Sequence, residues 1–349
     1  MSCILVTGGA GFIGSHLCEF LLTRGHSVIA LDDLSTGSLE NLKAIQRNPS
    51  FELVIDTVLN KTLLERLSAK SEGVFHLAAA VGVRTVIEHP LSSLRTNVEG
   101  TTNVLESSVV FGRKVLLTST SEVYGKNEDA PFKEEDNLII GPTFIRRWGY
   151  ACSKALDEFL AQAYFLEKKV PIIIARLFNT IGPRQTGRYG MVVPKFISQA
   201  LSGKPITIYG DGKQSRCFTY VSDVVEALYL LFRKEGLAGG VFNIGTREEV
   251  TINELARKIK RFCHSDSPII HIAPDKVYQE GFEDMRRRVP DLSRIEEAID
   301  YRPKVKLNEA LKRIIASYPH PNPPHRGRGP QCQIGGGVGG GGILRVPFP

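Results

Sequence analysis

Over the first half of the chain, short apolar runs alternate with segments in which apolar residues recur every three or four positions. The apolar runs predict buried strands, because parallel strands covered on both faces carry few polar residues. They lie at residues 3–9, 27–33, 51–55, 73–79, 114–120 and 171–179. The amphipathic segments predict helices at residues 12–25, 90–111 and 150–168, and Gly25 marks the end of the first.

Strands that alternate with helices in this way predict an α/β fold built on a Rossmann-type, doubly wound parallel sheet. The rhythm breaks at about residue 180, where the polar, glycine-rich loop GPRQTGRYG precedes shorter elements. We therefore expect a first domain at residues 1–179 and a smaller C-terminal lobe at residues 180–316. Part of about 213–245 is expected to return to the first domain.

The composition changes sharply after Ser317, where proline and glycine dominate and no acidic residue occurs. Such a segment has too little apolar surface to order itself. We predict a disordered, Gly/Pro-rich tail at residues 317–349. Read-through of non-coding sequence and a functional glycine-rich tail are both compatible with this composition.

The 349 residues are 42% hydrophobic and 23% charged, as expected for a soluble chain with a sizeable core. The net charge of +7 suits a polyanionic small molecule as well as nucleic acid. No basic stripe interleaved with aromatic residues is present, so the sequence does not predict nucleic-acid binding.

The six cysteines are scattered without C-x-x-C spacing, which argues against a metal site and against a disulfide framework. No run of 18 apolar residues occurs, so no membrane span is expected. Residues 2–8 run directly into predicted structure and leave no room for a signal peptide. These features together predict a cytoplasmic protein.

The segment VTGGAGFIG places Gly8, Gly11 and Gly14 between the first strand and the first helix, which Phe12 and Ile13 open. Glycines at this position permit a tight turn and a close approach of the backbone to a pyrophosphate. The helix N-terminus adds amide donors and positive potential. The pattern predicts a dinucleotide site.

Asp32 ends the second strand, roughly the 20 residues after the glycine turn at which a dinucleotide site carries an acidic residue. Its carboxylate would accept hydrogen bonds from the adenosine ribose and repel a 2′-phosphate, which favours NAD over NADP. The adjacent Asp33 could share this role. Asp56, after the third strand, could reach the adenine amino group or be a solvated loop acid.

Three tyrosines are each followed by a lysine four positions later: Tyr150, Tyr164 and Tyr209. A tyrosine and a lysine on one helix face can form a catalytic base. Tyr209 lies in a strand that enters a turn, so its lysine cannot share a helix face with it. Tyr164 lies near the helix end, where a packing role fits. Tyr150 lies near the helix start, where the ligand-binding edge of the sheet is expected, and it is our candidate.

A free tyrosine has a pKa near 10 and is a poor base at neutral pH. The ammonium of Lys154, one turn from Tyr150, and a positive nicotinamide ring would stabilise the phenolate. The hydroxyl of Thr120, at the end of the strand KVLLTST, could hydrogen-bond the substrate oxygen and relay its proton. These three residues could deprotonate a sugar hydroxyl while hydride leaves the same carbon for NAD.

In combination, several motifs resemble the extended short-chain dehydrogenase/reductases, the nucleotide-sugar epimerase/dehydratase family. The resemblance runs from residue 2 to about 316 through TGGAGFIG, HLAA, TNVEGT, TSTSEVYG, YACSK, ARLFNTIGPR and RCFTYVSD. It implies a tightly held NAD at residues 1–179 and a nucleoside-diphosphate sugar, most typically a UDP-sugar, bound by the lobe at 180–316. It also implies a homodimer formed through the helices near 95–110 and 150–168.

By position, the resemblance assigns the catalytic roles to Thr120, Tyr150 and Lys154. It assigns diphosphate or sugar contacts to Asn179, Arg216 and Arg288, although a surface ion pair is the alternative for either arginine. Some relatives that lost the catalytic residues serve as NAD-binding scaffolds, sensors or RNA-binding proteins. All three catalytic residues are present here, which favours an enzyme.

Three reactions share the first step, oxidation of the sugar C4 hydroxyl to a ketone: 4-epimerisation, 4,6-dehydration and decarboxylation of a glucuronate. Glu122 counts against the epimerases, and Ser121 counts against the dehydratases. STSEVYG together with Arg288 in an RxPD setting looks most like the UDP-glucuronate decarboxylases, which make UDP-xylose. We therefore predict that Glu122 is a catalytic residue and that Ser121 binds the substrate. The alternative for Glu122 is a structural carboxylate paired with an arginine such as Arg146 or Arg147.

Two loops depart from the decarboxylase pattern. Tyr189, Gly190 and Met191 replace the usual Asp-Gly-Arg, and VGVRTVIEHP near 81–90 resembles epimerase-like relatives. A UDP-glucose or UDP-glucuronate 4-epimerase is therefore the alternative, followed by a 4,6-dehydratase.

Overall fold

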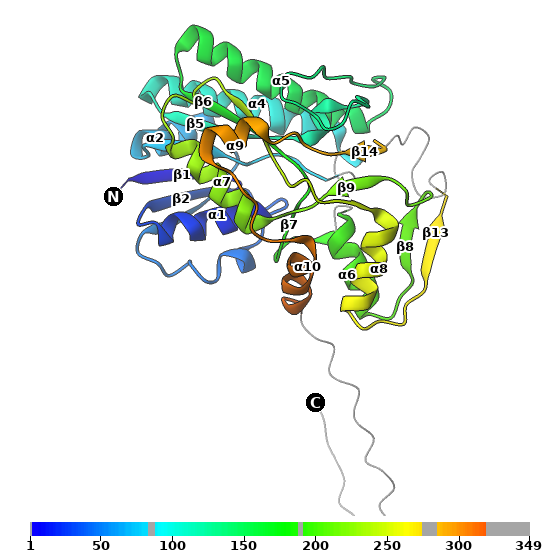
Figure 1. Ribbon diagram of the computed structural model, residues 1–349. Helices are drawn as coiled ribbons and strands as arrows, with labels where there is room; N and C mark the ends of the chain where they lie inside the picture. Colours follow the sequence, from blue (N-terminus) through cyan, green and yellow to red (C-terminus); the bar gives the residue numbers. More distant parts are fainter. Residues whose placement is uncertain (1, 83–87, 188–190, 274–284, 319–349) are drawn as a thin grey trace, which may run out of the picture. The chain divides into compact units, whose positions relative to one another are not determined.

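The computed structural model describes residues 2–82, 88–187, 191–273 and 285–318. The chain up to Tyr318 forms one compact unit, which has a seven-stranded parallel sheet with the order β11-β6-β5-β4-β1-β2-β3 (Figure 1). Its strands are β1 (Cys3–Thr7), β2 (Ser27–Asp32), β3 (Phe51–Ile55), β4 (Gly73–His76), β5 (Lys114–Thr120), β6 (Ile172–Leu177) and β11 (Val241–Ile244). The predicted doubly wound parallel sheet is confirmed.

Helices cover both faces of this sheet, because alternate residues of each buried strand point to opposite sides. On β1, Ile4 packs with α1 and α7, whereas Leu5 packs with α2 and α4. The helices of the first face are α1 (Phe12–Thr23), α7 (Val221–Arg233) and α9 (Ser293–Ile299). Those of the second face are α2 (Lys61–Lys70), α4 (Pro90–Phe111) and α5 (Arg147–Lys168).

Helix α5 begins at Arg147, three residues before the predicted start at residue 150. Ile145, Trp148 and Ala151 form a small buried cluster, which extends the buried face of the helix upstream. Tyr150 therefore lies within the first turn of α5. The short helices α2 and η1 (Leu39–Leu42) were not among the predicted elements.

Short elements build the C-terminal part of the compact unit around a second core. Its strands form three small sheets, of which the one with the order β12-β9-β14 contributes to the site. The strands are β7 (Thr180–Ile181), β8 (Ile206–Tyr209), β9 (Ser215–Cys217), β10 (Thr219–Tyr220), β12 (Glu249–Thr251), β13 (Ile269–Ile272) and β14 (Arg287–Arg288). The helices are α6 (Val192–Leu201), α8 (Ile252–Phe262) and α10 (Leu307–Ala316). The short helix η2 (Ser121–Tyr124) belongs to the first part of the chain and directly follows β5.

The chain returns to the large sheet after it has entered the C-terminal part. Helix α7 packs against α1, and β11 pairs in parallel with β6 at the edge of the sheet. The division into domains at 1–179 and 180–316 stays a prediction. Nearly all of the predicted tail, residues 319–349, lies outside the described residues.

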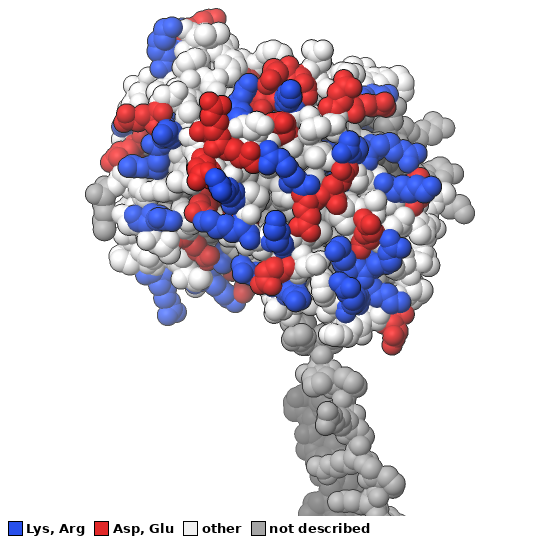
Figure 2. Space-filling model, viewed as in Figure 1, with Lys and Arg blue, Asp and Glu red and all other residues white. Residues whose placement is uncertain are grey.

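Within the described ranges, no helix is both long enough and apolar enough to cross a membrane. Basic and acidic side chains are interspersed over most of the face seen in Figure 2.

Candidate active site

A cavity of about 900 Å³ lies at the carboxyl ends of β1, β2, β4, β5 and β6. This is the edge at which open parallel sheets bind ligands. The structure brings most of the predicted site residues to it: Gly8, Gly11, Phe12, Ile13, Gly14, Asp32, Asp56, Thr120, Ser121, Glu122, Tyr150, Lys154, Asn179 and Arg288. Arg216 is not among the described residues that line it.

The three glycines at the start of α1 lie where a larger residue does not fit. Gly8 has a φ of +72°, and a Cβ there would stand 2.8 Å from the backbone nitrogen of Ala78. A Cβ on Gly14 would stand 2.1 Å from the carbonyl oxygen of Gly8. Gly11 caps α1 without a side-chain hydrogen bond, so the helix amides face the cavity. This arrangement fits the pyrophosphate of a dinucleotide.

Asp32 is held firmly at the end of β2. Its Oδ2 accepts a hydrogen bond from the amide of Ala10 (2.9 Å), and its Oδ1 accepts one from the amide of Leu34 (2.8 Å). Burial raises the pKa of this carboxyl, and the two amides oppose that effect. Asp56 likewise accepts hydrogen bonds from the amide of Thr57 (2.7 Å) and from Asn60 (3.0 Å).

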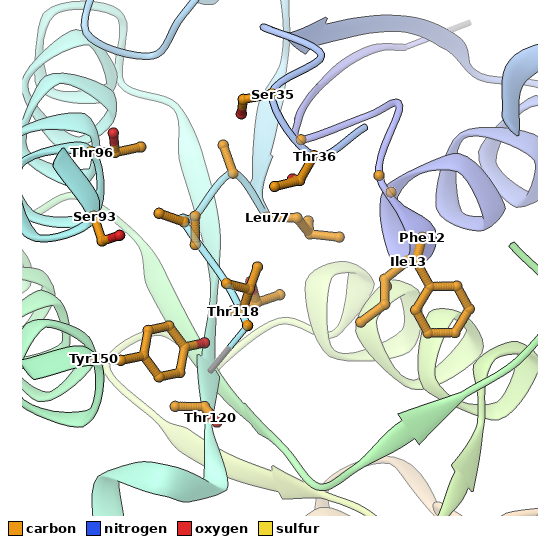
Figure 3. Close-up of a pocket in the computed structure, with 18 of the residues that line it drawn as sticks. Phe12, Ile13, Ser35, Thr36, Leu77, Ser93, Thr96, Thr118, Thr120 and Tyr150 are labelled. Atoms are coloured by element: carbon orange, nitrogen blue, oxygen red, sulfur yellow. The ribbon is translucent and has the colours of Figure 1, made fainter. Parts of the chain in front are cut away.

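The structure distinguishes the three tyrosines. Tyr150 reaches from α5 toward Thr120 on β5, with Phe12 and Ile13 across the cavity (Figure 3). Tyr164 packs beside the core between the sheet and α2, and Tyr209 lies under the ammonium of Lys195, 3.7 Å from the ring centroid. Neither is among the described residues that line the cavity.

Tyr150 is half-buried at the cavity wall, and its surroundings favour the neutral phenol. Burial is the main cause that raises its pKa, and the negative charges of Glu122 and Asp157 add to the effect. A hydrogen bond with Thr120 and the charge of Arg288 act in the opposite direction. We expected Lys154 and the nicotinamide ring to stabilise the phenolate. The protein without NAD does not do so, because it raises the pKa of Tyr150.

Lys154 forms an ion pair with Asp157, three residues further along α5, with 2.8 Å between Nζ and Oδ2. The two side chains are 3% and 0% exposed. Sequence reasoning missed Asp157, although the i, i+3 spacing that places it beside Lys154 was a usable signal.

Glu122 and Arg288 meet at the cavity wall, with 3.6 Å between Oε1 and Nη1. Ser121 lies beside Glu122 on η2. Arg216 on β9 lies opposite Arg288 on β14 in the register of the two parallel strands. Its guanidinium donates a hydrogen bond to the carbonyl of Ser215 (2.7 Å). The expectation that Arg216 contacts the substrate stays a prediction.

Two further residues join the cofactor end to the C-terminal part. Asn179 donates a hydrogen bond through Nδ2 to the carbonyl of Cys217 (3.0 Å), which anchors the end of β9. Arg184, which the sequence analysis did not assign, reaches α1 and binds Ser15 (3.2 Å) and Glu19 (2.6 Å).

Parts of the predicted site lie outside the described residues, namely Tyr189, Gly190 and residues 83–87. Within the described ranges, no group of three or more His, Cys, Asp and Glu side chains is placed to hold a metal ion.

Comparisons with known proteins agree with this geometry. The UDP-N-acetyl-alpha-D-glucosaminuronate decarboxylase of Bacillus cytotoxicus is 42% identical over 312 residues, which cover 89% of this chain and 96% of that protein. UDP-glucuronic acid decarboxylase 1 of Arabidopsis thaliana is 39% identical over 90% of this chain and 69% of its own length.

Among solved structures, UDP-glucuronic acid 4-epimerase from Bacillus cereus, in complex with UDP-glucuronic acid and NAD, has a TM-score of 0.82. It is 30% identical and covers 90% of this chain and 98% of its own. UDP-glucose 4-epimerase from Thermotoga maritima, with UDP-glucose, has a TM-score of 0.81 and is 32% identical, with the same coverage.

Residues 4–245 match the sequence model of the NAD dependent epimerase/dehydratase family. The glycine turn, Asp32 and Tyr150 at the cavity wall fit NAD as the cofactor. The chain belongs to the NAD dependent epimerase/dehydratase family and is an NAD-dependent enzyme.

Proposed function

We propose that the protein decarboxylates a UDP-hexuronate, with UDP-glucuronate as substrate and UDP-xylose as product. The observation that carries this proposal is the pairing of Glu122 with Arg288 beside Tyr150 in one cavity. An arginine at this position suits a sugar carboxylate, because its planar fork matches the two oxygens. The decarboxylases among the relatives support the same reaction.

The first step is oxidation at the sugar C4. Tyr150, as the phenolate, takes the proton of the C4 hydroxyl, while Thr120 hydrogen-bonds the same oxygen. NAD, when bound, would supply the hydride acceptor and donor for C4, and its positively charged ring would favour the phenolate that the protein alone disfavours. Lys154 adds positive charge one helical turn away.

Oxidation makes the sugar a β-keto acid, which loses carbon dioxide readily. The bond between C5 and the carboxyl carbon breaks, and its electrons form an enolate with the C4 oxygen. Tyr150, now protonated, and Thr120 can hydrogen-bond that oxygen. Arg288 holds the departing carboxylate, and after carbon dioxide leaves, C5 of the enolate takes a proton from water. Hydride return to C4 and a proton from Tyr150 complete the product.

Two specific observations favour other substrates or outcomes. The B. cytotoxicus relative, at 42% identity, is named for the 2-acetamido substrate, so UDP-N-acetylglucosaminuronate is a second candidate. Two solved neighbours are 4-epimerases, which keeps 4-epimerisation as the alternative reaction. Decarboxylation of either hexuronate and 4-epimerisation share the oxidation at C4 and differ only in the steps that follow it.

Product analysis by NMR distinguishes them. The purified protein is incubated separately with UDP-glucuronate, UDP-N-acetylglucosaminuronate and UDP-glucose, without added reductant. Release of carbon dioxide with UDP-xylose from the first supports the proposal. Carbon dioxide from the second alone would assign the acetamido sugar. A C4-epimerised product with no carbon dioxide would replace decarboxylation by epimerisation.

We further propose a homodimer formed through α4 and α5. Along α5, exposed apolar residues recur at spacings of three and four positions, which is the pattern of a helix-packing seam. Phe159 is 68% exposed and Leu166 is 63% exposed. Exposed apolar side chains on the two helices include Leu91, Leu94, Val109, Val110, Cys152, Leu156, Phe159, Ala163 and Leu166. A cytoplasmic location stays a prediction from the sequence.

A further inference from the structure

The ion pair between Lys154 and Asp157 lies in the protein interior. The Asp157 side chain is completely inaccessible, and its Oδ2 receives the Lys154 ammonium at 2.8 Å. Its other oxygen, Oδ1, is buried and hydrogen-bonds none of the described residues. A buried carboxylate without a full set of hydrogen bonds is costly, so this arrangement calls for an explanation.

A hydrogen-bonded chain leads from β1 to this pair. The ring of His76 is held between the hydroxyl of Thr7 (2.7 Å, at Nδ1) and that of Thr101 (3.1 Å, at Nε2). Burial raises the pKa of the Asp157 carboxyl, whereas Lys154 and the hydroxyl of Thr101 on α4 act in the opposite direction. Burial and the charge of Lys154 lower the pKa of His76 to about 3, so this ring is neutral and adds no charge.

Charged and titratable groups approach Tyr150 and Asp157 from each neighbouring element. Negative charges come from η2, α5 and Glu88, which precedes α4, and positive charges come from α5, β6 and β14. The groups are Glu88, His89, Glu122, Arg147, Lys154, Glu158, Arg176 and Arg288, with neutral His76 on β4. Glu158 is engaged by Arg176 through two nitrogens, so Asp157 is the carboxylate that balances Lys154.

We propose that Asp157 is a positioning residue that holds the Lys154 ammonium inside α5 and thereby sets the charge that the catalytic Tyr150 experiences. It does not touch the reacting atoms. It acts in two ways, because it fixes where the lysine ammonium lies and because it offsets much of that positive charge.

The consequence for the reaction concerns the strength of the base. A phenol that holds its proton more tightly is a stronger base once ionised, so the oxidation at C4, which delivers a proton to Tyr150, is favoured. The ketone form of the sugar is thereby favoured while the carboxylate leaves. This consequence rests on the proposed oxidation at C4, whereas the charge relationship between Asp157 and Tyr150 does not.

Ultraviolet titration of Tyr150 tests the inference without turnover. Because the chain has 10 tyrosines, tyrosinate absorbance is taken as the difference between each protein and the same protein carrying Tyr150→Phe. In Asp157→Asn, which removes the charge and keeps the shape, Tyr150 should ionise at lower pH than in the wild type. Asp157→Glu should restore the wild-type titration. Unchanged ionisation of Tyr150 in Asp157→Asn would overturn the inference.

If Asp157→Asn does not fold, a second pair of variants tests the same influence of Asp157 on Tyr150. Lys154→Met is compared with the double variant Lys154→Met/Asp157→Leu, which replaces the whole ion pair with apolar groups. Tyr150 should ionise at lower pH in the double variant than in Lys154→Met. Equal ionisation in the two proteins would exclude an influence of Asp157.

The pH dependence of turnover links the titration to catalysis. In Asp157→Asn, the acidic limb of kcat/KM should move to lower pH in step with the ionisation of Tyr150. Glu167→Gln, an exposed residue of the same helix, is the matched control and should keep the wild-type profile. A wild-type protein that converts none of the three nucleotide sugars would reject the proposed function, while the titration would still decide the inference.

Discussion

The guanidinium of Arg288 lies 3.6 Å from the carboxylate of Glu122, although the two residues come from distant parts of the chain. Glu122 follows β5 of the large sheet, and Arg288 lies on β14, a two-residue strand that pairs with β9. Helix α5 and η2 of the first part of the chain thus supply Tyr150 and the Glu122 carboxylate, and β14 supplies the cation that meets Glu122. A site that must hold a substrate carboxylate near a ketone requires both.

Arg288→Lys should impair decarboxylation more than oxidation. Lysine keeps the positive charge but cannot hold two carboxylate oxygens in one plane. We expect release of carbon dioxide from UDP-glucuronate to fall roughly a hundredfold, as for the loss of an oriented charge stabiliser. Single-turnover absorbance of the reduced cofactor would show whether oxidation persists. Equal release of carbon dioxide by Arg288→Lys and the wild type would contradict the assigned role.

Tyr150→Phe should abolish proton transfer and leave cofactor binding intact. The loss of a general acid–base residue typically slows a reaction about 10²- to 10⁴-fold. NAD affinity, measured by calorimetry, should stay the same because the phenyl ring is retained. Tyr164→Phe, which belongs to the other helical Tyr-x-x-x-Lys pair, is the control and should turn over normally. Normal turnover in Tyr150→Phe would remove this residue from the mechanism.

Gly14→Ala should weaken NAD binding and lower stability. The new Cβ would stand 2.1 Å from the carbonyl oxygen of Gly8, so the start of α1 must move away from the turn. Overpacking of this kind typically costs about 1–3 kcal/mol. Chemical denaturation and NAD titration together would measure both effects. Unaltered NAD affinity would mean that the turn tolerates a larger residue.

The burial of His76 should make the protein sensitive to acid. The pKa of this ring is about 3 in the folded chain against 6.5 in an unfolded one, so between these values the unfolded chain binds the additional proton. The free energy of unfolding should therefore fall as the pH drops below 6.5, by up to about 1.4 kcal/mol per pH unit from this group. Below about pH 3 this loss should level off.

Urea denaturation across this pH range, compared between the wild type and His76→Asn, isolates the contribution of the ring. The variant should lose stability less steeply on acidification. His264→Asn, at an exposed position with a left-handed backbone that asparagine tolerates, should keep the wild-type slope. Parallel slopes in wild type and His76→Asn would contradict the prediction.

Phe159→Glu should disrupt the proposed dimer. A charge at the centre of the apolar row on α5 would have to be desolvated on association. Sedimentation velocity should show a dimer for the wild type and a monomer for the variant. Lys43→Glu, a charge change at another exposed position, should leave the dimer unaffected. A monomeric wild type would reject the homodimer.

The sequence predicted those parts of the molecule that depend on local patterns. The strands and the first helix begin within a residue or two of their predicted positions, because continuous apolar runs and glycine turns determine them locally. The choice of Tyr150 over Tyr164 and Tyr209 also followed from position along predicted elements. Most of the residues assigned to the site line one cavity for the same reason.

Pairings between distant segments were beyond the sequence pattern. The position of Arg216 beside Arg288 depends on β9 joining β14 and β12, strands of two or three residues that carry no periodic signal. The partner of Lys154 was missed because a charged residue on a helix is expected to face water. Its burial follows from the packing of α4 against α5, which the sequence alone does not show.

The return of the chain to β11 has a consequence for synthesis on the ribosome. A nascent chain that has emerged only to residue 179 would present β6 as an unpaired edge strand, and the α1 face of the sheet would lack α7. Exposed edges of this kind invite pairing with other chains. The nucleotide-binding half therefore cannot close until residue 244 has been added, and a truncation before that point should yield aggregates rather than a smaller NAD-binding protein.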